Sequence, residues 1–329
     1  MKHGGDLGEA IAQHGGAPSD WLDLSTGINP CPWPLPDAFA VDVWRRLPSH
    51  ADNVALLAAA RAAYAVPEGV DIVAAAGTQA LIQWLPCLVE NGAVAVVGHT
   101  YNEHALAWRR AGHAVVAVDD LATAVARGRH VVVVNPNNPD GRIFSHDELR
   151  QAARAVQRNG GWLVIDEAFA DVDPALTAAA LCGDLPIVIL RSFGKFYGLA
   201  GVRLGFAIAA PALAERIAEA LGSWSCSGPA LAIGAAALAD RAWATRTRES
   251  LKAMAEALDG ALMQAGLTIV GGTLLFRLAR HSQAAAIHAR LARHHIWCRR
   301  FNDAPDLLRF GLPPDEAACE RLITALRSG

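Results

Sequence analysis

One lysine follows an apolar run, Ile187 to Leu190, that predicts a buried strand. Only three of the 29 basic residues are lysines, and Lys195 lies among glycines in Ser192-Phe193-Gly194-Lys195. A desolvated lysine amine can lose its proton and form a Schiff base with a carbonyl, which arginine cannot do. Two plainer explanations stay open here, a surface lysine in a glycine-rich turn and a general bias of the chain toward arginine.

A carboxylate ends the predicted strand before this one. Asp166 follows Trp162-Leu163-Val164-Ile165, with no lysine or arginine near it in the sequence. Because an unpaired buried carboxylate is costly, we expect a cationic partner, and a protonated pyridine nitrogen is one such cation. Capping of a neighbouring helix is the other interpretation. Together Lys195 and Asp166 match the two needs of pyridoxal phosphate, a partner for its aldehyde and one for its pyridine nitrogen.

Two further predicted strands also end in glycine-bearing or polar turns. Gly77-Thr78-Gln79 opens a helix, which suits an anion, and Asn135 to Gly141 follows the strand at 130–134. Ligands of open parallel sheets bind beyond the carboxyl ends of the strands. Any one of these segments is an ordinary turn, but four of them at one edge of a sheet indicate a site.

The elements that must position these residues alternate along the chain. Short apolar runs alternate with stretches of helical length, which is typical of a parallel sheet with crossover helices. The predicted strands are Asp71–Ala75, Ala93–Val97, Ala114–Val118, His130–Val134, Trp162–Ile165, Ile187–Leu190 and Leu204–Ile208. The predicted helices are 37–65 with a break at Pro48, 78–90, 103–111, 121–127 and 146–159.

The pattern changes after Pro211. Helices at 211–222, 229–240 and 242–265 precede short strands and two more helices, at 283–294 and 314–327, which predicts a smaller α+β domain. We expect strands at Thr268–Val270, Leu274–Leu278, Ile296–Arg299 and Leu307–Phe310. The sequence thus predicts an α/β fold with three parts: an N-terminal arm of little regular structure (1–35), a large domain (36–220) and a small C-terminal domain (221–329).

Composition limits the classes of partner and compartment. The net charge is −3, the apolar fraction is 53%, and basic residues are scattered, so we expect neither a nucleic-acid nor a membrane surface. The six cysteines show no metal-ligand or disulfide spacing, and no secretory segment is visible at the N-terminus. We expect a cytoplasmic enzyme with free thiols, no metal and a small-molecule substrate.

With these motifs in order, the whole chain resembles the fold-type-I pyridoxal-phosphate enzymes of the aspartate aminotransferase superfamily, near histidinol-phosphate aminotransferase. That resemblance implies a mostly parallel large-domain sheet and a homodimer. It implies a Schiff base at Lys195, a protonated pyridine nitrogen at Asp166, Asn138 on the ring hydroxyl oxygen and Tyr101 stacked on the ring. The implied cofactor-binding residues are Gly77, Thr78, Gln79, Tyr101, Asn138, Asp166, Phe169, Ser192, Lys195 and Arg203.

Other residues match the substrate side of the family. The phosphate of the cofactor would be held by Gly77, Thr78, Ser192 and Arg203. Arg309, in Leu308-Arg309-Phe310-Gly311, matches the arginine that binds the substrate carboxylate, and Arg299 matches a second anion-binding arginine. His3 and Asn29 are further candidates for a phosphate group on the substrate.

The chain departs from a plain aminotransferase at two positions. Phe169 stands where the family has a tyrosine that donates to the ring oxygen, and Leu47 stands where a tyrosine reaches the neighbouring subunit. The N-terminal segments His3-Gly4-Gly5 and Ser25 to Pro30 resemble L-threonine-O-3-phosphate decarboxylases, the cobalamin-pathway enzymes that make (R)-1-amino-2-propanol O-2-phosphate. That group tolerates phenylalanine at the tyrosine position. Decarboxylation is therefore the main hypothesis, and transamination of the histidinol-phosphate type is the alternative.

Three other hypotheses are weaker. Ser192-x-x-Lys195 matches the serine signature of penicillin-binding enzymes, but the chain contains neither Ser-Asp-Asn nor Lys-Thr-Gly. A phosphate-binding loop would need glycine at Ile189 and a hydroxyl at Phe196. A cofactor-binding regulator without catalysis is disfavoured because Lys195 is present together with its partner residues.

Overall fold

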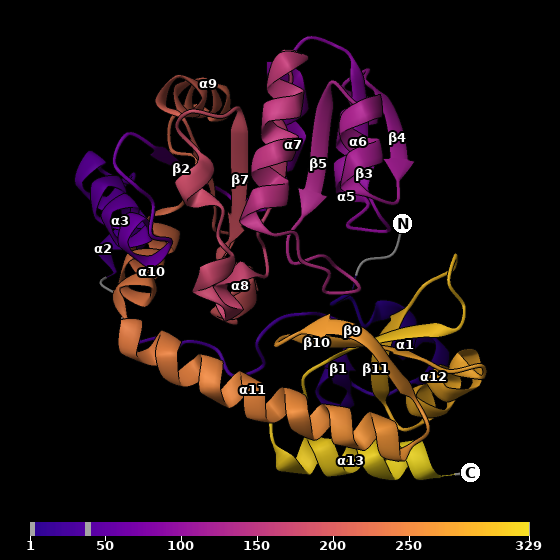
Figure 1. The fold of residues 1–329 in the computed structure, drawn as a ribbon. Helices are drawn as coiled ribbons and strands as arrows, with labels where there is room; N and C mark the ends of the chain where they lie inside the picture. The colour runs from indigo at the N-terminus through magenta and orange to yellow at the C-terminus, as the bar shows by residue number, and fades with distance from the viewer. Residues whose placement is uncertain (1–3, 37–40, 329) are drawn as a thin grey trace. The chain divides into compact units, whose positions relative to one another are not determined.

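The computed structural model describes residues 4–36 and 41–328, which form two compact units (Figure 1). The large unit comprises Trp33–Asn138 and Arg142–Ala244, and the small unit comprises Met1–Pro32, Pro139–Gly141 and Thr245–Gly329. The sequence placed the domain boundaries after residues 35 and 220, and these boundaries stay predictions. Within the described residues, no helix is long and apolar enough to cross a membrane.

The large unit is built on a seven-stranded sheet in the order β2-β8-β7-β6-β5-β3-β4. Its strands are β2 (Asp71–Ala75), β3 (Ala93–Val97), β4 (Ala114–Val118), β5 (His130–Val134), β6 (Leu163–Asp166), β7 (Ile187–Ser192) and β8 (Gly205–Ala209). Its helices are α2 (Asp42–Arg45), α3 (His50–Ala63), α4 (Thr78–Trp84), α5 (Glu103–Arg110), α6 (Leu121–Arg127), α7 (His146–Arg158), α8 (Phe193–Phe196), α9 (Pro211–Leu221) and α10 (Gly228–Ala239). The sequence predicted each of these strands to within two residues at either end.

Strand β8 differs from the parallel pattern expected from the sequence. It pairs antiparallel with β7 on one side and with β2 on the other, while β3 to β7 are all parallel to one another. Parallel strands are normally joined by a crossover that carries a long helix. The segment between β7 and β8 instead contains the four-residue helix α8 and a short 3₁₀ turn, so the chain reverses direction.

Buried aliphatic residues explain why these segments form strands. Every residue of β5, β6, β7 and β8 is buried, as expected for strands covered on both faces. On one face Val132, Val164 and Val188 pack with Leu81 of α4 and Trp108 of α5 in one cluster. Burying an aliphatic side chain of this size stabilises the fold by about 1.5–3 kcal/mol, so this core fixes the strand ends that carry the candidate residues.

The small unit contains a five-stranded sheet in the order β1-β11-β12-β10-β9. Its strands are β1 (Leu22–Leu24), β9 (Thr268–Thr273), β10 (Phe276–Arg280), β11 (Ile296–Arg300) and β12 (Leu307–Gly311). Its helices are α1 (Gly8–His14), α12 (Ala284–Arg293) and α13 (Glu316–Arg327), and α11 (Arg241–Gln264) runs from the large unit into this one.

The expectation of an N-terminal arm with little regular structure is wrong for the described part of that segment. Residues 8–14 form α1, and β1 pairs in parallel with β11 through Leu22↔Ile296 and Leu24↔Cys298. Leu22 and Leu24 are buried, so the strand is held by its alternating leucines. A strand of three residues between glycine- and proline-rich segments gives too short a pattern to recognise without its partner strand.

Candidate active site

Three candidate residues follow neighbouring parallel strands at one edge of the large-unit sheet. In the register, Val134 of β5, Asp166 of β6 and Leu190 of β7 lie side by side. Asn135 N–H donates to the Asp166 carbonyl at 2.8 Å. Asn138 follows β5, Asp166 ends β6, and Ser192 ends β7 directly before the lysine-bearing turn. The structure therefore confirms that these strand ends meet, as the strand pattern predicted.

Asp166 is buried, with 3% of its surface exposed, and both carboxylate oxygens have partners. Oδ2 lies 2.8 Å from Nε2 of His104, which is 1% exposed, and Oδ1 accepts from Ala168 N–H at 3.0 Å. The sequence did not indicate that His104 contacts this carboxylate. His104 was missed because its contact with Asp166 joins residues that are 62 positions apart in the sequence.

Lys195 lies on α8 and is half-buried. Its Nζ lies 5.9 Å from the ring centroid of Phe169, which is buried. The turn is closely packed, since a Cβ on Gly194 would lie 2.6 Å from Cα of Ala200. The position of the amine is therefore set by a rigid turn beside an aromatic face, in surroundings that reduce its contact with water.

Arg203 and Gly77 form a second part of the candidate site. Arg203 adopts a left-handed backbone (φ 55°), which is uncommon for a residue with a side chain. Gly77, with φ 81°, precedes α4, and a Cβ there would lie 2.5 Å from Nη2 of Arg203. A glycine is thus required for the guanidinium to reach the start of α4. Strain of this kind is retained where it serves a site.

Tyr101 is half-buried directly before α5, and its ring lies edge-on to His104 with 6.1 Å between centroids. Burial raises the pKa of Tyr101 to about 12, and the negative charge of Glu103 adds to that shift. Its phenol therefore stays protonated at neutral pH. The hydroxyl donates to Oε1 of Gln79 at 3.3 Å.

Asn138 is half-buried in the loop after β5, and its neighbours fix the backbone there. The side chain of Asn135 accepts from Phe144 N–H at 2.8 Å. Asn137 donates to the His99 carbonyl at 3.0 Å and accepts from Thr100 Oγ1 at 2.7 Å. The side chains of Asn135 and Asn137 thus hold the backbone of this loop.

A buried ionic cluster that the sequence did not indicate lies beside these strand ends. Arg191 contacts Glu167 and Asp171, each at 2.9 Å, and its guanidinium lies 4.3 Å from the ring centroid of Tyr64. All four side chains are buried. Arg191 precedes Ser192 and Glu167 follows Asp166, so the pair ties the ends of β6 and β7 together.

The substrate candidates lie in the small unit. Arg309 of β12 and Arg299 of β11 are direct cross-strand neighbours. Arg309 is 7% exposed, its Nη2 donates to the Ser25 carbonyl at 2.6 Å, and its Cζ lies 5.2 Å from the ring centroid of Phe276. Burial, with a contribution from the charge of Arg299, lowers the pKa of Arg309 to about 10. Both guanidinium groups therefore stay charged at neutral pH and favour an anion.

The other candidate substrate-binding residues are Asn29, Arg299 and His3. Asn29 is buried, and its Oδ1 accepts from Cys31 N–H at 2.9 Å. Burial lowers the pKa of Arg299. His3 lies outside the described residues. Among residues 4–36 and 41–328, no group of three or more His, Cys, Asp or Glu side chains is placed to bind a metal ion.

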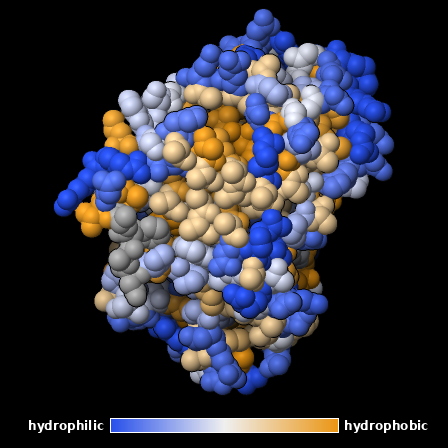
Figure 2. Space-filling view, turned by 90° about the vertical axis from the view of Figure 1, so that its left-hand side faces the viewer, coloured by the Kyte–Doolittle hydropathy of each residue, from blue (hydrophilic) through white to orange (hydrophobic). Residues whose placement is uncertain are grey.

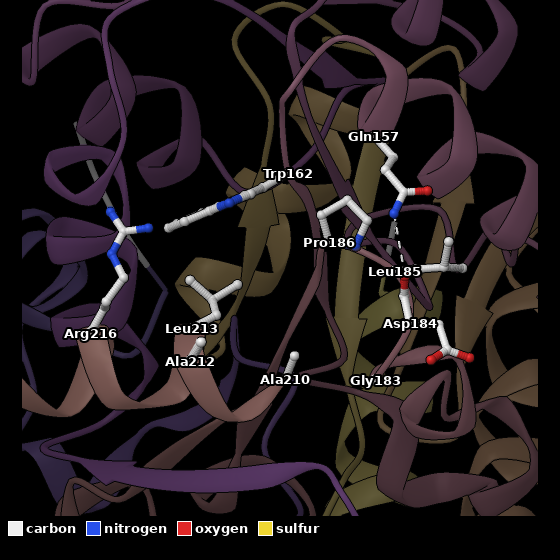
Figure 3. A pocket seen from close by; sticks show the side chains of 10 residues that line it. All are labelled: Gln157, Trp162, Gly183, Asp184, Leu185, Pro186, Ala210, Ala212, Leu213 and Arg216. Carbon is white, nitrogen blue, oxygen red and sulfur yellow. Dashed lines mark hydrogen bonds between the residues drawn. The ribbon is translucent and has the colours of Figure 1, made fainter.

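A pocket of about 310 Å³ lies at the opposite edge of the large-unit sheet (Figure 3). Trp162 and Pro186, which line it, directly precede β6 and β7, whereas Asp166 and Ser192 end those strands. Arg216 lies over the ring of Trp162, with 5.5 Å between Cζ and the ring centroid. This pocket is therefore separate from the candidate active site.

Comparison with known proteins gives one family and close relatives. The model of the class I and II aminotransferase family matches residues 46–326. A threonine-phosphate decarboxylase of Sinorhizobium sp. is 45% identical over 328 residues, which covers 98% of this chain and 97% of that protein. A threonine-phosphate decarboxylase of Pseudomonas aeruginosa is 44% identical over 329 residues, 99% of this chain and 97% of the relative.

A solved structure shares the fold. The histidinol-phosphate aminotransferase from Clostridium acetobutylicum superposes with a TM-score of 0.82 over 92% of this chain and 97% of that one. The two sequences are only 20% identical, so this likeness concerns the fold alone. It confirms the fold type that the sequence motifs predicted.

Proposed function

Because the chain belongs to the class I and II aminotransferase family, we propose that it is a pyridoxal-phosphate-dependent carboxy-lyase. The reaction is decarboxylation of L-threonine O-3-phosphate to (R)-1-amino-2-propanol O-2-phosphate and CO₂, a step of cobalamin biosynthesis. The observation that carries this proposal is 44–45% identity over nearly the whole chain to two threonine-phosphate decarboxylases. The aminotransferase of the histidinol-phosphate type remains the alternative, but the structural likeness to such an enzyme concerns the fold alone.

The residues present fit pyridoxal phosphate. Asp166 is a buried carboxylate whose orientation His104 fixes, as a protonated pyridine nitrogen requires. Gly77 leaves the space that the Arg203 guanidinium occupies, which suits a phosphate group. Thr78 follows Gly77, and Ser192 pairs with Gly205, which packs against Thr78, so both hydroxyls are available nearby.

Each candidate residue then has a part in binding or proton transfer. When bound, pyridoxal phosphate supplies an aldehyde for the substrate amine and a cationic ring that accepts electrons. The Lys195 amine would hold the aldehyde and could move protons, and Asp166 would keep a proton on the pyridine nitrogen. The ring of Tyr101 packs on the cofactor, Asn138 donates to its hydroxyl oxygen, and Phe169 borders the amine.

Two neighbouring arginines of the small unit are the candidates for binding the anionic groups of the substrate. Arg309 and Arg299 carry two adjacent positive charges, and the substrate carries a carboxylate and a phosphate. Guanidinium groups bind such anions through paired hydrogen bonds and so set their orientation. Asn29 and His3 are further candidates for the phosphate. Loss of CO₂ leaves an electron pair on the substrate Cα, and Lys195 Nζ is the group that returns a proton there.

The deciding experiment supplies pyridoxal phosphate and L-threonine O-3-phosphate and follows CO₂ release without any keto acid. We expect turnover by the wild type and by Lys252→Ala, which changes an exposed lysine, and none by Lys195→Ala. The wild type should also be yellow, and Lys195→Ala should lose the corresponding absorbance. Turnover that requires a keto-acid acceptor and prefers histidinol phosphate would contradict the decarboxylase assignment.

We further propose a homodimer in the cytoplasm. All six cysteines are free thiols, which suits a reducing compartment. The dimer proposal is supported by five exposed apolar residues around α2 and α3, here called the α2–α3 patch: Val41, Trp44, Leu47, Val54 and Trp224. Figure 2 looks onto the side of the molecule where α2 and α3 lie and shows apolar residues gathered there. Large exposed apolar patches commonly mark protein interfaces, and a second copy is the partner that family membership favours.

A further inference from the structure

Both polar atoms of the Gln79 side chain are engaged by protein groups. It is the second residue of α4, and the family resemblance implied that it binds the cofactor. Its Oε1 accepts the hydroxyl of Tyr101 at 3.3 Å, and its Nε2 donates to Oε2 of Glu103 at 2.9 Å. One amide therefore joins the start of α4 to both sides of the start of α5.

The orientation of this amide follows from chemistry. A carboxylate accepts hydrogen bonds and cannot donate them when ionised, so the amide group facing Glu103 must be the NH₂. The carbonyl oxygen of Gln79 then faces the phenol of Tyr101, which must donate. The phenol keeps its proton at neutral pH, because burial raises the pKa of Tyr101 to about 12. The three groups thus form a chain in which each donor meets an acceptor.

This series of hydrogen bonds restrains the hydroxyl end of the Tyr101 ring. The edge of the same ring contacts His104, the partner of the buried carboxylate of Asp166. Tyr101 lies edge-on to His104, with 6.1 Å between centroids and 86° between planes. His104 in turn contacts Asp166 at 2.8 Å. A tyrosine ring turns about two side-chain bonds, so holding its hydroxyl at one end and its edge at the other fixes the plane of the ring.

We propose that Gln79 is a positioning residue, whose side chain holds the Tyr101 ring in the plane that packs against the bound cofactor. This inference rests on the proposed function, because it takes pyridoxal phosphate as the group that Tyr101 contacts. Gln79 touches neither the cofactor nor the substrate through its side chain and acts through Tyr101. Glu103 sets the orientation of the amide and so belongs to the same device.

The test is a double-mutant cycle on the dissociation constant of pyridoxal phosphate, using Gln79→Met, Tyr101→Phe and the double variant. Methionine keeps the length of the side chain and removes the acceptor. We expect Gln79→Met to weaken cofactor binding roughly 3- to 10-fold, the range of one net hydrogen bond. In the Tyr101→Phe background the same change should have no effect, because the phenol is already gone. The matched control Gln83→Met, on the same helix, should bind as the wild type does.

An equal loss in both backgrounds would overturn the inference, since Gln79 would then act independently of Tyr101. A wild type that fails to bind pyridoxal phosphate at all would instead contradict the proposed function, so the two failures are distinguishable. A second measurement does not need the cofactor. Phenolate absorbance of the cofactor-free protein is followed as the pH is raised. The absorbance step that is present in the wild type and missing in Tyr101→Phe belongs to Tyr101.

That step should move to lower pH in Gln79→Met, because an acceptor for the phenol proton stabilises the protonated form. An unchanged step would show that the hydrogen bond does not restrain the phenol, and the inference would fail. Should Gln79→Met fold poorly, Gln79→Leu serves the same cycle.

Discussion

Nε2 of His104 lies 2.8 Å from Oδ2 of Asp166, and both side chains are buried. The pair joins the first turn of α5 to the end of β6 inside the large unit. A hydrogen bond to a charged group contributes about 1.5–3 kcal/mol. The contact therefore fixes the carboxylate in the orientation in which its other face can meet a ligand cation.

Replacing His104 should weaken cofactor binding without removing it. In His104→Ala we expect roughly 10-fold weaker binding of pyridoxal phosphate and a free energy of unfolding lower by about 1.5–3 kcal/mol. Fluorescence titration and urea unfolding measure the two effects. His146→Ala is the control, because His146 is exposed at the start of α7. Wild-type affinity in His104→Ala would show that the pair has no part in cofactor binding.

Gly77 and Gly69 allow the effect of backbone strain to be separated from the effect on the site. Both have positive φ, 81° and 76°, but a Cβ on Gly69 meets nothing within 4 Å, whereas one on Gly77 displaces the Arg203 guanidinium. Both alanine variants should lose about 1–2 kcal/mol of stability through left-handed strain. Only Gly77→Ala should bind pyridoxal phosphate more weakly, roughly 10- to 100-fold, as loss of charge-assisted bonds to a phosphate predicts. Equal affinities in the two variants would place the phosphate elsewhere.

How much the sequence predicted depended on whether a feature was local. Strands β3, β5, β6 and β7 are largely buried apolar runs, so their positions followed from composition and spacing. The roles of Lys195, Asp166 and Asn138 followed from their places after those strands and stay proposals. The reversal of β8, the pairing of β1 with β11 and the contact of His104 with Asp166 join segments far apart in the chain. Those features depend on tertiary contacts, and the spacing of residues along the sequence does not reveal which distant segments meet.

The α2–α3 patch predicts the oligomeric state. The wild type should have twice the chain mass of 34.7 kDa in light scattering. The double variant Trp44→Glu with Trp224→Glu should be monomeric, since both side chains are more than 60% exposed and a buried charge at an interface is unfavourable. Trp84→Glu, at an exposed tryptophan outside the patch, should remain a dimer. A monomeric wild type would rule out the dimer, and a dimeric double variant would place the interface elsewhere.

Acid should destabilise the large unit through His130, a residue remote from the proposed chemistry. Its Nδ1 accepts from Trp162 N–H at 3.1 Å, so the ring is neutral and the other nitrogen carries the proton. That Nε2 has no hydrogen-bond partner within the described part of the chain. Burial, with a contribution from the charge of His113, lowers the pKa of His130 to about 4.

The sign of the pH effect follows from proton counts. Between pH 6.5 and 4 the unfolded chain binds more protons at His130 than the folded chain does, so stability falls as the pH is lowered through this range. From pH 7 to pH 5 the expected loss is about 2 kcal/mol from this group. His130→Gln removes the titration, so its free energy of unfolding, measured in urea at both pH values, should fall by about 2 kcal/mol less than that of the wild type. Because His146→Gln alters an exposed histidine, it should keep the wild-type pH dependence. Identical pH dependence in His130→Gln and the wild type would mean that the ring is protonated in the folded protein, contrary to the hydrogen bond that its Nδ1 accepts.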